Sequence, residues 1–416
     1  MKVEAQASRA ADAAQFLLDL AGALHEAYMP ADQVERRLRQ AACGLHLGAE
    51  VFTLQTVAAV ELWGSTCVHL RRMPFSPHWN LVRHRALIDL CEAIAAERLG
   101  LPAARAELDR IEAMPPRYAH GVVLAAYAVY GAAVAARVGG GPPEIAGALL
   151  IGIVAGTIYF GTFRFPFVDL QKTFLAALLG TLAAFALRLV LPPFDAERAL
   201  FGATTLLIPA MVVTIGTSEL VTEAAVEAGL VRLAYALLRF LMLALGIVAA
   251  AKLWQIALPI PAAVPAHPVP TAAVVAILVP GGLALVACMQ GRAREAGWIV
   301  AAVLVAWGAQ ELTKRIFGDA GSPFLAALTL GVFAQLHARI PGHSPATILF
   351  PGLLQLAPGF LGTEAVVALL RPSQADPGET FFHVLLVALQ IVTGLLAASL
   401  VPALAVRPPR SARGAT

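Results

Sequence analysis

Charge is scarce in this sequence, and the shortage limits what the protein can be. Only 14% of the 416 residues are Asp, Glu, Lys or Arg, whereas an average soluble domain has about 25%. Hydrophobic residues make up 59% of the chain, and its mean hydropathy is +0.74. Most of the chain is therefore expected to lie in lipid, which excludes an ordinary soluble protein. The net charge of +3 is too small to indicate a nucleic-acid partner.

Cysteine is also scarce, and several catalytic motifs are missing. The four cysteines have no C-x-x-C spacing, so neither a disulfide framework nor a zinc site is expected, and no metal or cofactor is predicted. The chain has no G-x-x-x-x-G-K-[ST] loop, which argues against an ATP-driven pump. Because G-x-S-x-G and H-E-x-x-H are absent as well, the sequence predicts that the protein is not an enzyme.

Most of the charge that is present lies before Tyr118. Residues 1–117 are rich in Arg, Glu and Asp, and their hydrophobic spacing changes from helical to period two and back to helical. This pattern predicts a small α+β domain over residues 1–117. No basic segment followed by an apolar stretch and a small-residue cleavage site opens the chain, so we expect this domain to be cytoplasmic. The expected helices are 10–28, 31–47, 80–99 and 102–113, and the expected strands lie near 52–54, 60–62 and 68–70.

After Tyr118, apolar runs of membrane-spanning length follow one another. A Pro-rich linker over residues 259–270 divides them into two sets of five, residues 118–258 and 271–405, and residues 406–416 form a tail. The sequence thus predicts a polytopic α-helical membrane protein with about ten transmembrane helices. The expected spans are 119–137, 144–161, 174–191, 199–216, 232–257, 271–290, 296–313, 323–340, 346–367 and 381–403.

The basic residues outside the spans indicate the orientation. The expected inner loops and tail hold more Lys and Arg than the outer loops, with Arg232 counted among the inner ones. This bias and the even number of spans predict cytoplasmic N- and C-termini in the plasma or inner membrane. Arg239, near an end of the fifth span, is interpreted as a side chain that snorkels to the interface.

The two sets of five spans resemble each other. Four short matches recur in the same order at offsets of 142 to 150 residues. Each set has an odd number of spans, so the second set must enter the membrane from the opposite side, which is the inverted-repeat plan of many secondary transporters. The matches are FLAAL at Phe174 and Phe324, Pro209 and Pro351, Gly216 and Gly362, and Gly246 and Gly394.

Proline and glycine interrupt the fourth and ninth spans, which correspond in the two repeats. An interrupted helix exposes backbone groups that lipid cannot satisfy, so the breaks are expected to face inward and form a polar site. Thr214, Thr217 and Ser218 would supply hydroxyl groups, and Glu219 or Glu364 would meet an ammonium group or carry a proton. The candidate residues are Pro209, Thr214, Gly216, Thr217, Ser218, Glu219, Pro351, Gly352, Gln355, Pro358, Gly359 and Glu364.

The alternative interpretation is that these features bind nothing. Proline kinks also occur in spans without a ligand, and Glu219 and Glu364 would then mark the starts of loops.

Several of these segments resemble the threonine/serine exporter family. The resemblance implies a cytoplasmic α+β domain joined to ten spans, and export of small amino acids driven by the proton-motive force. With the inverted repeat, we hypothesise a secondary exporter that works by alternating access. Its partners would be a small amino acid, protons and the lipid bilayer; a homo-oligomer is left open. The segments are PADQVERRL from Pro30, RAELDRIEAMPPRY from Arg105, LLIPAMVVTIGTSELV from Leu206, GLVRLAYALLRFLMLALG from Gly229 and ILFPGLLQLAPGFLG from Ile348.

Three other functions stay open at this point. Relatives that carry the two modules on separate chains are associated with dicarboxylate export, so a succinate-like substrate is one alternative. The soluble domain could instead be a hydrolase that uses His with Ser or Cys. In the third alternative the membrane part is an anchor, and the soluble domain recruits a partner.

Overall fold

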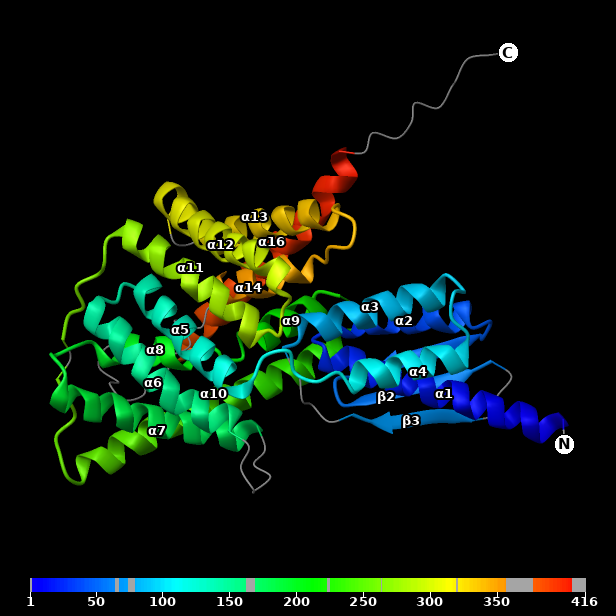
Figure 1. The fold of residues 1–416 in the computed structure, drawn as a ribbon, viewed down its shortest axis with the longest axis horizontal. Helices are drawn as coiled ribbons and strands as arrows, with labels where there is room; N and C mark the ends of the chain where they lie inside the picture. The colour runs from blue at the N-terminus through cyan, green and yellow to red at the C-terminus, as the bar shows by residue number, and fades with distance from the viewer. Residues whose placement is uncertain are drawn as a thin grey trace, which may run out of the picture.

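A computed structural model describes residues 2–63, 67–73, 79–161, 169–222, 225–262, 264–318, 321–356 and 377–405. The chain is divided between an N-terminal part of helices and a small sheet and a larger bundle of helices beside it (Figure 1). Each part has its own main cluster of buried hydrophobic side chains.

The N-terminal part packs four helices with a three-stranded antiparallel sheet of order β1-β2-β3. Ala58, Val60 and Leu62 alternate along the central strand and are buried, so one face of the sheet joins the core of this part. The first helix begins at Lys2, earlier than the period of the sequence predicts. The elements are α1 Lys2–Glu26, α2 Ala31–Gly44, β1 Ala49–Thr53, β2 Val57–Leu62, β3 Val68–Arg72, α3 Leu81–Ala95 and α4 Leu101–Glu112.

The remaining described residues are mostly helical and mostly apolar. Six helical segments are long and apolar enough to cross a membrane, and α9, α13, α14 and the stretch Leu385–Leu400 of α16 are shorter apolar helices. The helices are α5 His120–Arg137, α6 Pro142–Phe160, α7 Asp169–Val190, α8 Ala196–Thr204, α9 Ala210–Leu220, α10 Val226–Gln255, α11 Thr271–Cys288, α12 Ala296–Phe317, α13 Ser322–Ala338, α14 Ala346–Leu356 and α16 Pro377–Ala405.

The expected fourth and ninth spans differ from single crossings. In place of one helix over 199–216 the structure has α8 and α9, separated at residues 205–209. In the ninth span, α14 passes through Pro351 and reaches Leu356, and residues 357–367 lie outside the described part. Pro351 itself does not end α14, because the helix continues on both sides of it; Pro358 and Gly359, the other residues of the expected break, lie outside the described residues.

The first helices of the two predicted repeats, α5 and α11, pack against each other in antiparallel directions. The Tyr118 hydroxyl, just before α5, donates to the carbonyl of Gly291, just after α11. A methyl group added at Gly281 in α11 would lie 2.5 Å from the Ala133 side chain, so the helices touch near their middles too. Beyond the other end of α5, a methyl group at Gly141 would lie 2.5 Å from the carbonyl of His267, which precedes α11.

The same backbone contact occurs once in each predicted repeat. In the first, Gly246 of α10 faces the carbonyl oxygen of Phe174 in α7, and an added methyl group would lie 2.5 Å from that oxygen. In the second, Gly394 of α16 faces the carbonyl oxygen of Phe324 in α13 in the same way. Glycine lets these backbones approach because it has no side chain.

The N-terminal part contacts the helical bundle at several points. The backbone N–H of Leu81 donates to the Met289 carbonyl over 2.9 Å, and the His84 ring packs edge-on against Phe350 at a centroid distance of 5.3 Å. Arg85 also donates to the carbonyl of His343 over 3.3 Å. Helix α9 lies at this junction (Figure 1).

Replacing Gly246 or Gly394 by alanine should force α7 and α10, or α13 and α16, apart. Overpacking of this kind destabilises proteins by roughly 1–3 kcal/mol, so we expect a clearly lower melting temperature in detergent for either variant. Gly297→Ala in α12 is the matched control, because nothing lies within 4 Å of an added methyl group there. Equal melting temperatures in all three variants would contradict the close approach.

Candidate functional site

The break between α8 and α9 is buried in the bundle. Leu207 and Ile208 are 0% and 3% exposed, and Pro209 stands immediately before α9, where its missing N–H costs nothing. The carbonyl of Ala203, near the end of α8, accepts a hydrogen bond of 2.7 Å from the Tyr127 hydroxyl on α5. A side chain of the protein thus supplies a hydrogen bond to a backbone carbonyl at this break. Lipid cannot supply such a bond, so an interrupted helix in a membrane requires it.

Two glycines bring α9 and α10 into backbone contact. A methyl group at Gly229 would lie 2.7 Å from the carbonyl oxygen of Gly216, and one at Gly216 would lie 3.2 Å from that of Gly229. Residues three apart on a helix share a face. The side chains of Glu219 and Arg232, each three residues beyond its glycine, therefore meet at the same crossing.

Glu219 and Arg232 form a buried ion pair. Arg232 Nε lies 3.0 Å from Glu219 Oε1 and 2.8 Å from Oε2, and both side chains are 0% exposed. Moving two charges out of water costs several kcal/mol per ion, which only close pairing and further hydrogen bonds can offset. Both further hydrogen bonds come from the N-terminal part.

The loop between α1 and α2 supplies these hydrogen bonds. The backbone N–H of Ala31 donates to Glu219 Oε1 over 2.8 Å, and Arg232 Nη2 donates to the Met29 carbonyl over 2.9 Å. Ala31 is the first residue of α2, so Glu219 receives an N–H group that has no partner inside the helix. The carboxylate also lies at the positive end of the α2 dipole.

His25 of α1 lies beside this pair. Its ring is 3% exposed, and neither ring nitrogen has a hydrogen-bond partner among the described residues. Burial and the positive charge of Arg232 lower the pKa of His25 to about 3. The imidazole is therefore neutral at physiological pH and leaves the charge balance of the pair unchanged.

The hydroxyl groups expected to face a ligand all donate within α9. Thr214 bonds to the Ala210 carbonyl over 3.0 Å, Thr217 to that of Val213 over 2.8 Å, and Ser218 to that of Ile215 over 2.8 Å. Because each hydroxyl proton is already donated to a backbone carbonyl, the hydroxyl oxygens can accept a hydrogen bond from a ligand but cannot donate one.

A second polar cluster ties α6, α7 and α10 together. Arg239, expected to snorkel, is instead 4% exposed, and its guanidinium lies 3.3 Å from Asp169 and 2.5 Å from the Tyr159 hydroxyl. Tyr235 donates to the same Asp169 carboxylate over 2.7 Å. The snorkelling interpretation fails because Asp169 gives the arginine a partner inside the protein.

The α14 residues named from the sequence meet α5. Gln355 is fully buried; its amide donates to the Tyr130 hydroxyl over 3.0 Å, and its backbone carbonyl accepts from Arg137 over 3.0 Å. Gly352 faces the side chain of Leu330 in α13 and leaves no room for a Cβ there. Pro358, Gly359 and Glu364 lie outside the described residues.

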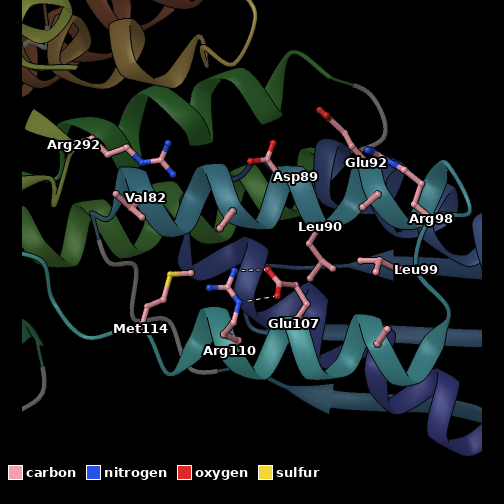
Figure 2. Close-up of a pocket in the computed structure, with 13 residues that line it drawn as sticks. Val82, Asp89, Leu90, Glu92, Arg98, Leu99, Glu107, Arg110, Met114 and Arg292 are labelled. Atoms are coloured by element: carbon pink, nitrogen blue, oxygen red, sulfur yellow. Dashed lines mark hydrogen bonds and ion pairs between the residues drawn. The ribbon is translucent and has the colours of Figure 1, made fainter. Parts of the chain in front are cut away.

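A separate cavity of about 730 Å³ lies between α3 and α4 (Figure 2). Its lining mixes both signs of charge: Glu107 pairs with Arg110, whose hydrogen bond lowers the pKa of Glu107, and Arg292 enters from the membrane part. Among the described residues, no group of three or more His, Cys, Asp or Glu could hold a metal ion.

Sequence reasoning placed Arg232 in an inner loop, and that was wrong. The structure places it fully buried in α10, opposite Glu219. A signal was present in the sequence, since Gly216-x-x-Glu219 and Gly229-x-x-Arg232 have the same spacing. Met29 and Ala31 contact the ion pair through backbone atoms alone. Their residue types therefore give no indication of these contacts in the sequence.

The length and apolar surface of the helices indicate the class of protein. Long apolar helices, with exposed side chains such as Leu189, Leu245 and Ile316, suit a lipid environment and make this a multi-pass membrane protein. The chain also matches two family models, the threonine/serine exporter model ThrE over residues 15–254 and the model "Threonine/Serine exporter, ThrE" over residues 272–401. The chain therefore belongs to the threonine/serine exporter family, whose members are transporters rather than enzymes. Comparisons with curated proteins and with solved structures found no match.

Removing one member of the Glu219–Arg232 pair should destabilise the protein strongly. An uncompensated buried charge costs about 3–5 kcal/mol, so we expect Glu219→Gln and Arg232→Met each to lower the melting temperature markedly. The double variant should lose less than the sum of the two, because no charge is left unpaired.

The exposed ion pair of Glu107 and Arg110 is the control for these single and double variants. A surface pair contributes about 0–1 kcal/mol, so Glu107→Gln should have little effect on the same measurement. Additive losses at Glu219 and Arg232 would contradict a buried pair.

Proposed function

We propose that this protein is a secondary exporter of small amino acids of the threonine and serine kind, coupled to the proton-motive force. The observation that carries the proposal is the buried interruption between α8 and α9, followed within α9 by the buried Glu219 carboxylate. Interrupted helices and ionisable groups at membrane depth are costly and mark substrate or proton sites in carriers. Membership of the exporter family supports the substrate class.

The transport cycle is alternating access between two inverted repeats of five helices. The antiparallel packing of α5 and α11 supports this arrangement, because the first helices of inverted repeats point in opposite directions. The matched contacts of Gly246 with Phe174 and of Gly394 with Phe324 support it as well. In this arrangement the N- and C-termini are cytoplasmic, the protein lies in the plasma or inner membrane, and residues 1–117 form a cytoplasmic α+β domain.

The substrate lies against the interrupted fourth and ninth segments. Hydroxyl oxygens of Thr214, Thr217 and Ser218 accept hydrogen bonds from it, and Gln355 and the glycines line its path. Glu219 or Glu364 meets the ammonium group or carries the coupled proton. A carboxylate suits this role because taking up a proton removes its charge and loosens its hold on a cationic partner.

Efflux of labelled threonine from loaded proteoliposomes tests the function. Wild-type protein should release threonine faster when a pH gradient is imposed, and Glu219→Gln should lose that acceleration by about tenfold or more, the effect of roughly 1.4 kcal/mol. Glu227→Gln is the matched control, since Glu227 is an exposed glutamate in the first turn of α10. The double variant Glu219→Gln/Arg232→Met leaves no unpaired charge, so a loss of acceleration that it shares with Glu219→Gln does not come from an uncompensated Arg232.

Gradient-driven efflux that is equal in wild type and in both Glu219 variants would remove Glu219 from the mechanism. Efflux of labelled succinate without efflux of threonine would instead support the dicarboxylate alternative.

A further inference from the structure

The loop over residues 28–31 enters the helical bundle. Tyr28 is 5% exposed and belongs to the buried cluster of the membrane part, although its neighbours in sequence pack in the N-terminal core. Its φ of 63° is in the left-handed region, which a tyrosine adopts only when its surroundings hold it there. The ring packs edge-on against Trp79 at a centroid distance of 5.9 Å. Met29 and Ala31 are each 2% exposed, so three of the four loop residues are buried and Pro30 is partly buried.

The loop presents two backbone groups to the ion pair. Its Met29 carbonyl accepts from Arg232 and its Ala31 N–H donates to Glu219, two residues further along. An α-amino acid carries the same two kinds of group close together: a carboxylate that accepts from a guanidinium and an ammonium that donates to a carboxylate. Arg232 also keeps a buried Nη1 without a partner among the described residues, so it has a further donor for a carboxylate oxygen.

We propose that Glu219 and Arg232 bind the ammonium and carboxylate groups of the exported amino acid, and that the Tyr28–Ala31 loop occupies this site as an internal inhibitor. The inference rests on the proposed function. The amino acid reaches the pair only when the loop has withdrawn, because both side chains are fully covered while the loop is in place.

The charges favour a zwitterion as the occupant. Glu219 and Arg232 carry no net charge together, and His25 beside them is neutral, so a substrate with one positive and one negative group leaves the site balanced. A dicarboxylate would place two negative charges beside one arginine and one glutamate, and like charges at short range are unfavourable in a buried site.

The loop is placed to gate access to Glu219 and Arg232, because it contacts both helices that carry them. It bonds directly to α9, the helix that follows the break, and to α10. Ala31 also packs with Ala225 and Ala228 in a small buried cluster of its own. Withdrawal of the loop frees two buried charges at once, and an amino acid from the cytoplasm restores both sets of hydrogen bonds.

A reversible lock tests the gate. In an Ala31→Cys/Ala228→Cys variant, a disulfide would hold the loop on α10. We expect oxidation to slow threonine efflux by about tenfold or more, since only the withdrawn state binds substrate, and a reductant to restore it. Ala228→Cys alone, treated with the same oxidant, is the control for effects of oxidation at other cysteines. Undiminished efflux from protein that is fully cross-linked by mass spectrometry would overturn the proposal.

Labelling with a water-soluble thiol reagent tests the loop without any transport. In an Ala225→Cys background, Tyr28→Ala should speed labelling of residue 225 by about 5- to 150-fold, the range of typical couplings between sites. Arg85→Ala, which removes a contact elsewhere in the same junction, should leave the rate unchanged. Equal effects of both variants, or no effect of either, would overturn the gate. If wild-type protein moves no threonine, the proposed function fails, and the labelling result still decides whether the loop covers the pair.

Discussion

A charge buried in an apolar protein has to find its opposite charge and its hydrogen bonds within the chain. Glu219 and Arg232 are both fully buried, and each makes hydrogen bonds to the other and to the loop between α1 and α2. Because removing either charge leaves the other exposed to a low-dielectric surrounding, the pair fixes α9, α10 and the N-terminal part relative to one another. Gly216 and Gly229 have no side chains, so α9 and α10 can come close enough for the two charges to pair.

The same requirement explains why the polar groups of the bundle are concentrated where its elements meet. Arg239 pairs with Asp169 between α10 and α7, and Arg137 bonds to the carbonyl of Gln355 between α5 and α14. The first contact lies within the first predicted repeat, whereas the second joins the two predicted repeats, which the proposed alternating-access cycle would move relative to one another.

The sequence predicted the features that depend on local pattern. Apolar runs located the helices of the membrane part, and Pro209 located the interruption of the fourth span. The sequence did not predict which charged side chains are buried, because that depends on partners far away in the chain. Arg232 was predicted to lie in an inner loop and Arg239 to snorkel to the interface, but their distant partners Glu219 and Asp169 make burial possible. The backbone contacts of Met29 and Ala31 have no signature in residue type and could not be predicted.

In the proposed gate, a bound amino acid takes the place of the 28–31 loop on Glu219 and Arg232. Hydrogen exchange of the Ala31 amide, measured by mass spectrometry on the full-length protein in detergent, reports whether the loop is in place, because that amide donates to Glu219. Saturating threonine should speed its exchange while leaving the amides of the β2 strand unchanged. Unchanged or slower exchange at Ala31 in the presence of threonine would contradict displacement of the loop by the amino acid.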